Sequence, residues 1–179
     1  AFHAPRLVLI DINSFKTLSE SEIKNGMGEG IKYAVLTGGE LSKMVEVGIK
    51  DLERFIELCV SYKKDIVERD FKESGDRKLL NLGHTFAHAA EKLSNYTLPH
   101  GIAVAKGLMS VSEYAYRTNK LSFKDKEKIK NMIKAAGIDE TMPYKINELA
   151  FVMRMDKKAD SDGEVSLVVP YSVGECKIE

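Results

Sequence analysis

The sequence has no tryptophan, two cysteines and four prolines among its 179 residues. Cys59 and Cys176 lie far apart, so they form neither a disulfide framework nor a CxxC motif, and a reduced, cytoplasmic setting is the simplest interpretation. The longest apolar stretches, such as residues 7–10, are too short to cross a membrane, and no basic-then-apolar signal peptide is recognisable. We therefore expect no membrane partner.

The sequence also lacks an excess of charge of either sign. Its 27 Lys and Arg residues balance 27 Asp and Glu residues, which gives a formal net charge of zero. A strong basic surface for nucleic acid or anionic lipid is therefore not expected. A hydrophobic content of 44% is close to that of globular proteins, and the length fits one domain, residues 1–179.

Most of the chain has the apolar spacing of helices. A Ser/Thr cap followed by acidic residues predicts a helix from about 20 to Thr37, ended by two glycines. Similar patterns predict helices at 40–47, 50–72, 77–93, 102–118 and 124–136, and the segments 164–170 and 174–178 are typical of a β-hairpin. The predicted fold is mainly α: a multi-helix orthogonal bundle with a short N-terminal strand and a small C-terminal hairpin.

The predicted N-terminal strand covers residues 7–11, an apolar run that ends in an aspartate. A single strand needs a neighbour, and none is close in the sequence. Either this strand pairs with the C-terminal segment, or the chain is the back half of a larger protein whose sheet it completes.

Polar residues recur along the predicted helix at 77–93. Arg77, Asn81, His84 and His88 would fall within an arc of about 60° on one helix face. The alternative is an ordinary solvated face, but such a face usually consists of lysines and glutamates. Histidines at positions i and i+4 have the spacing that lets two imidazole nitrogens bind one metal ion, so this face indicates a functional site.

His100 is a second candidate, because it stands at the predicted N-terminus of a buried helix of small residues. The helix dipole there favours the neutral imidazole that a metal requires. The alternative is a loop histidine that only caps the helix.

The run GMGEGIK at 26–32 supplies a carboxylate, Glu29, and a lysine, Lys32, about one turn apart. It is not a GxGxxG nucleotide loop, because Ile31 stands in the place of a glycine and the preceding segment is helical. Each glycine in a helix lowers the stability of the helix by about 1 kcal/mol. The presence of three glycines is explicable if a backbone or a ligand approaches this segment closely. A surface ion pair is the alternative, but it leaves the glycines unexplained.

Glu29 with two imidazoles forms the three-ligand set with an open position that is typical of catalytic zinc. The spacing does not decide which two of His84, His88 and His100 bind the metal. His3, near the terminus, is an unpromising ligand.

Five segments carry a resemblance to a known family: FHAPRLVLID, GMGEGIKYAV, KESGDRKLLNLGHTFAHAAE, LPHGIAVAKGL and MDKKADSDG. Together they resemble the C-terminal, metal-binding half of the 3-dehydroquinate synthases, which are sugar-phosphate cyclases. The resemblance covers essentially the whole chain. It implies that residues 1–179 form the C-terminal metal- and substrate-binding domain, and that an α/β domain with most of the NAD contacts is absent from the chain.

The resemblance also implies roles for individual residues. Zn²⁺ or Co²⁺ would be held by Glu29, His84 and His100, and His88 would serve in proton transfer. Lys63 and Glu73 are implied as catalytic residues. The implied substrate-binding residues are Lys32, Lys63, Arg77, Asn81 and Lys157.

The implied reaction converts the sugar-acid phosphate DAHP to 3-dehydroquinate and phosphate in the shikimate pathway. It proceeds through transient oxidation by NAD⁺, phosphate elimination, reduction and intramolecular aldol closure, which makes the enzyme a carbon–oxygen lyase. A homodimer is expected for the intact enzyme, and the chain alone is not expected to complete turnover. The alternatives are another sugar-phosphate cyclase, a metal-dependent polyol dehydrogenase and an inactive helical fragment.

Overall fold

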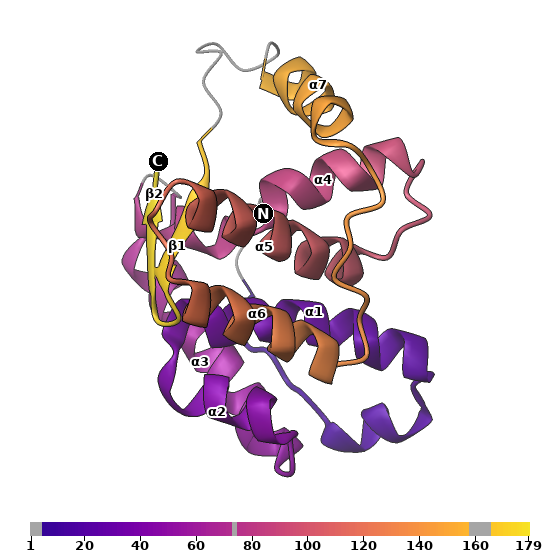
Figure 1. Ribbon diagram of the computed structural model, residues 1–179. Helices are drawn as coiled ribbons and strands as arrows, with labels where there is room; N and C mark the ends of the chain where they lie inside the picture. Colours follow the sequence, from indigo (N-terminus) through magenta and orange to yellow (C-terminus); the bar gives the residue numbers. More distant parts are fainter. Residues whose placement is uncertain (1–4, 73–74, 158–165) are drawn as a thin grey trace.

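The computed structural model describes residues 5–72, 75–157 and 166–179, and its fold is mainly α, as the sequence predicts (Figure 1). A C-terminal antiparallel hairpin of β1 (Val168–Ser172) and β2 (Glu175–Ile178) is also confirmed. The described residues also include the 3-10 helices η1 (Ile12–Thr17) and η2 (Asp76–Asn81). The α-helices are α1 (Glu20–Thr37), α2 (Gly39–Val47), α3 (Leu52–Arg69), α4 (His84–Leu93), α5 (His100–Arg117), α6 (Phe123–Ala135) and α7 (Ile146–Lys157).

Helix α5 lies at the centre of the fold and packs against α1, α4 and α6 (Figure 1). Its crossing with α1 depends on glycine. A Cβ atom on Gly28 would lie 1.8 Å from the carbonyl oxygen of Gly101, and one on Gly101 would lie 1.7 Å from the carbonyl oxygen of Asn25. Gly30 leaves room for the Phe55 ring, whereas Gly26 has nothing within 4 Å. The expected close approach of a backbone is thus confirmed at Gly28, whereas the neighbour of Gly30 is a side chain.

The single helix predicted over 77–93 is wrong, because the chain turns at Gly83 between η2 and α4. Gly83 has φ +79°, and a Cβ there would lie 2.9 Å from backbone atoms of both Val104 and Leu108. A side chain on Gly107 would in turn lie 2.2 Å from the carbonyl oxygen of Gly83. The close contact between α4 and α5 leaves no room for a side chain at residue 83, and the left-handed backbone there also favours glycine. The helix is therefore interrupted at Gly83.

The strand predicted at residues 7–11 is also not found. Leu7 and Leu9 are 79% and 87% exposed, and the sheet that the structure describes consists of β1 paired with β2. No ladder partner for this run exists among the residues that the structure describes, and a strand without a partner has no hydrogen-bonded ladder. The chain instead passes into η1, where the Asp11 side chain accepts a hydrogen bond from the Asn13 N–H at 2.9 Å.

Helix α7 was not predicted, although Leu149, Val152 and Met153 have helical spacing. It packs against α4, and Leu149 is 2% exposed. The connection from α6 to α7 is held by the buried Lys106 of α5, whose Nζ donates to the carbonyl oxygens of Asp139 and Thr141, the latter at 2.7 Å.

Replacing Lys106 with methionine is expected to lower the free energy of unfolding by about 1–3 kcal/mol, because the carbonyl groups of Asp139 and Thr141 lose a charged donor while the apolar stem is kept. Urea denaturation measures the effect. Lys128→Met is the control, since Lys128 forms a partly exposed ion pair with Glu46 and should cost less than about 1 kcal/mol. Equal losses in the two variants would contradict the role of Lys106.

Within the described residues, none of the helices combines the length and the hydrophobicity that a membrane span requires.

Candidate metal centre and adjoining cavity

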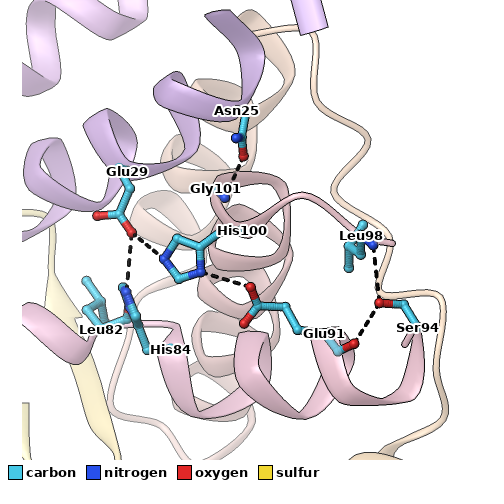
Figure 2. Close-up of polar contacts among 9 residues, drawn as sticks. All are labelled: Asn25, Glu29, Leu82, His84, Glu91, Ser94, Leu98, His100 and Gly101. Atoms are coloured by element: carbon cyan, nitrogen blue, oxygen red, sulfur yellow. Dashed lines mark hydrogen bonds and ion pairs between the residues drawn. The ribbon is translucent and has the colours of Figure 1, made fainter. Parts of the chain in front are cut away.

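The side chains of His84 and His100 both point at a carboxylate oxygen of Glu29, and the three residues come from three different helices (Figure 2). Glu29 Oε1 lies 3.3 Å from His84 Nε2 and 3.2 Å from His100 Nε2. One donor atom from each of the three residues lies within 4.8 Å of the others. Among the described residues, this is the group of histidine and acidic side chains whose geometry could hold a metal ion.

The positions of these donors follow from the helix ends and from the glycine crossing. His84 is the first residue of α4, directly after Gly83, and His100 is the first residue of α5, directly after Pro99. Glu29 follows Gly28, where α1 touches α5. The crossing of α1 and α5 thus brings Glu29 to His100, and the turn at Gly83 aims His84 at the same oxygen.

The carboxylate of Glu29 is ionised. Burial alone would raise its pKa, but the hydrogen bond from His84 and the charge of Lys32 outweigh burial and lower the pKa to about 2. Lys32 Nζ lies 2.6 Å from Glu29 Oε2, and the lysine side chain is only 4% exposed. This pair is therefore not the surface ion pair that the sequence left as an alternative. Burial lowers the pKa of Lys32, and the negative charge of Glu29 opposes that effect.

The second nitrogen of each imidazole also has a partner. His84 Nδ1 lies 3.2 Å from the carbonyl oxygen of Leu82, and His100 Nδ1 lies 3.0 Å from Glu91 Oε1. With a metal ion in place of the Nε2 proton, a ring whose Nδ1–H donates to a carbonyl or carboxylate would offer its Nε2 lone pair to the ion, which is the arrangement of metal-binding histidines.

His88 lies beside these rings but outside the group around Glu29. Its ring centroid is 5.5 Å from that of His84 and 6.2 Å from that of His100. The spacing of His84 and His88 left open which histidines would converge, and the structure brings His84 and His100 to Glu29.

A cavity of about 550 Å³ adjoins the three donors. It lies among α1, α3, η2 and the first residues of α4 and α5, and three cationic side chains line it together with an amide. The lining residues are Glu29, Lys32, Tyr33, Cys59, Val60, Lys63, Arg77, Leu80, Asn81, His84 and His100.

A model of the family described as 3-dehydroquinate synthase C-terminal matches residues 26–159. The chain belongs to this family. It is 41% identical over 180 residues to the 3-dehydroquinate synthase of Thermococcus kodakarensis and 37% identical over 182 residues to that of Pyrococcus abyssi. Each alignment covers 99% of this chain but only 51% and 54% of the two relatives. The chain thus spans about half the length of the curated relatives it matches.

Two solved structures of synthases with other names share the fold. The 2-epi-5-epi-valiolone synthase of Streptomyces hygroscopicus, with NAD⁺ and Zn²⁺ bound, has a TM-score of 0.89 at 19% identity, over 100% of this chain and 52% of that one. A 2-deoxy-scyllo-inosose synthase with carbaglucose-6-phosphate, NAD⁺ and Co²⁺ has a TM-score of 0.75 at 22% identity, over 91% and 48%. Identities this low show a common fold alone.

In this member of the 3-dehydroquinate synthase C-terminal family, most of the expected site residues lie together. Lys32, Lys63, Arg77 and Asn81 all line the cavity, although Arg77 and Asn81 come from η2 and not from the helix of His84. His88 is not among the lining residues. Three expectations lie outside the described residues: Glu73, His3 and the side chain of Lys157, the last residue of α7.

Sequence reasoning missed Tyr33, Cys59, Val60 and Leu80 as lining residues. A signal existed for Cys59, which precedes Lys63 by one turn of α3 and so shares its face. Burial raises the pKa of the Cys59 thiol to about 12, so the thiol remains protonated and is no nucleophile.

Proposed function

We propose that this chain is the metal- and substrate-binding half of a 3-dehydroquinate synthase, a carbon–oxygen lyase that converts DAHP to 3-dehydroquinate and phosphate. The observation that carries the proposal is the meeting of Glu29, His84 and His100 at the wall of a cavity lined by cations. A carboxylate and two imidazoles form a set of catalytic type, since three protein ligands leave a coordination position for substrate.

The residues present fit Zn²⁺ or Co²⁺, because the donor atoms of Glu29, His84 and His100 converge and both imidazoles are supported at their second nitrogen. Such an ion, when bound, lowers the pKa of a substrate hydroxyl and stabilises the developing alkoxide. The Zn²⁺ and Co²⁺ in the two synthases of the same fold support this assignment.

The cations of the cavity suit a substrate with two anionic groups. Lys32, Lys63 and Arg77 would neutralise the carboxylate and the phosphate of a sugar-acid phosphate, and Asn81 would hydrogen-bond to its polar groups. We assign proton transfer to His88, whose ring lies beside those of His84 and His100, with centroid separations of 5.5 and 6.2 Å. Lys63 and Glu73 are proposed as further catalytic residues, and Lys157 as a further substrate contact.

We also propose how this chain fits into the whole enzyme. Residues 1–179 form one domain, and NAD is bound mainly by an N-terminal α/β domain of the whole protein. The relatives named above are about twice as long as the stretch that this chain matches, which supports this division. The intact enzyme is proposed to be a cytoplasmic homodimer.

A synthase of another product is the second candidate, because two such enzymes share the fold. They are only 19% and 22% identical to this chain, whereas the 3-dehydroquinate synthases are 41% and 37% identical. Sequence similarity therefore favours DAHP as the substrate.

The test joins this chain to the N-terminal half of the Thermococcus kodakarensis relative and measures phosphate release with NAD⁺ and Zn²⁺. The fusion is expected to release phosphate from DAHP and not from a hexose 6-phosphate, and the 179-residue chain alone is expected to release none. Release by the fusion from the hexose phosphate alone would favour the second candidate. Turnover of DAHP by the chain alone would contradict the proposed division between two domains.

A further inference from the structure

The two histidines at Glu29 differ in how firmly they are held. The His84 side chain is 13% exposed, whereas that of His100 is 46% exposed. An exposed side chain samples several rotamers, and fixing one of them on metal binding costs free energy. His100 therefore needs a contact that fixes its ring before the metal arrives.

Glu91 of α4 makes that contact. Its Oε1 lies 3.0 Å from His100 Nδ1, and its side chain is only 13% exposed. Figure 2 shows the ring of His100 between the two carboxylates, with Glu91 at Nδ1 and Glu29 at Nε2. A neutral His100 that donates its Nδ1–H to Glu91 keeps the lone pair on Nε2, the nitrogen that faces Glu29.

Glu91 is itself fixed at its backbone. Its carbonyl oxygen accepts hydrogen bonds from Ser94 Oγ at 2.8 Å and from the Tyr96 N–H at 2.7 Å, and Ser94 Oγ accepts the Leu98 N–H at 3.2 Å. These bonds fold the short connection between α4 and α5 back onto the end of α4. The distance between the backbones of Glu91 and His100 is thereby set.

Helix α1 holds the backbone next to His100. The Asn25 side chain on α1 accepts the Gly101 N–H at 2.7 Å, so it fixes the first turn of α5 directly after His100 (Figure 2). The backbone of His100 is thus held from α1, which leaves the orientation of its ring to Glu91.

We propose that Glu91 is a positioning residue for the metal centre: it fixes the tautomer and the ring orientation of His100, so that Nε2 is ready to bind the ion. The proposal rests on the metal centre of the proposed function. Glu91 is not a fourth donor, because its oxygen contacts the nitrogen of His100 that points away from Glu29. Such supporting carboxylates change metal affinity about 10- to 100-fold when removed.

The experiment measures the Zn²⁺ dissociation constant of the 179-residue chain by competition with a chromophoric chelator. Glu91→Ala is expected to raise the constant about 10- to 100-fold. Glu91→Gln keeps an acceptor oxygen and is expected to recover most of that loss. Glu113→Ala is the matched control, since Glu113 also lies on a helix and bonds to two cations, Arg117 and Lys126, away from His100. It is expected to leave the constant unchanged.

A further measurement separates positioning from metal ligation. The visible absorption of the Co²⁺-loaded chain reports the donor set, and Glu91→Ala is expected to keep the number of protein ligands. A spectrum that shows a lost ligand would make Glu91 a donor and would overturn the proposal.

The positioning role of Glu91 and the metal centre itself can be refuted separately. If the unaltered chain binds Zn²⁺ and Glu91→Ala binds it equally well, the positioning role is wrong and the metal centre stands. If the unaltered chain binds no Zn²⁺ stoichiometrically, both are wrong.

Discussion

Alanine at His84 is expected to remove stoichiometric zinc from the chain, whereas alanine at His88 leaves zinc bound. His84 Nε2 lies 3.3 Å from Glu29 Oε1 and belongs to the group of converging donors, while His88 lies outside that group. Loss of one of three protein ligands should weaken binding by more than the roughly 100-fold upper range for a supporting residue. Elemental analysis of protein purified without chelators gives the metal content.

His100→Ala is the companion variant, and it is expected to match His84→Ala in the loss of zinc. His88→Ala is expected to affect only turnover by the fusion protein, since we assign His88 to proton transfer. Equal loss of metal in His88→Ala and His100→Ala would show that the proposed ligand set is wrong.

Alanine at Gly28 or Gly101 is expected to lower the free energy of unfolding by about 3 kcal/mol or more. The new methyl group would lie 1.8 or 1.7 Å from a backbone carbonyl oxygen of the facing helix, which only a shift of the two backbones can relieve. Urea denaturation followed by circular dichroism measures the loss.

Gly26→Ala is the matched control, because Gly26 lies on the same helix with nothing within 4 Å of an added Cβ. There alanine is expected to stabilise the chain by about 0.4–1 kcal/mol through its better helix propensity. A Gly28→Ala variant as stable as Gly26→Ala would be inconsistent with the close crossing of α1 and α5.

Local signals in the sequence were sufficient to predict both ends of α1. The Ser19 hydroxyl accepts the Glu22 N–H at 3.2 Å at one end, and Gly38 with φ +62° follows the other end, as the capping pattern predicts. Such signals act within a few residues, so they can be recognised without knowledge of the rest of the fold.

The break at Gly83 could not be predicted in this way. Its left-handed conformation is imposed by the approach of Gly107 and its neighbours on α5, which are distant in the sequence. The strand expected at 7–11 failed for a related reason, because strand formation depends on a partner and not on apolar composition.

The candidate site shows the same division between local and tertiary information. The residue types that bind metals were recognisable, and the glycines around Glu29 indicated a close approach. The choice of His100 beside His84 depends on how α1, α4 and α5 cross, and spacing along one helix carries no information about that. The family resemblance implies the same three residues, because it carries information on the tertiary arrangement that spacing lacks.

The glycine contact between α1 and α5 also couples the packing of the fold to the metal centre. Glu29 follows Gly28 and His100 precedes Gly101, so each of these two residues is next to the point where the helices touch. A side chain at Gly28 or Gly101 that pushes the two backbones apart would therefore also widen the 3.2 Å gap between Glu29 Oε1 and His100 Nε2.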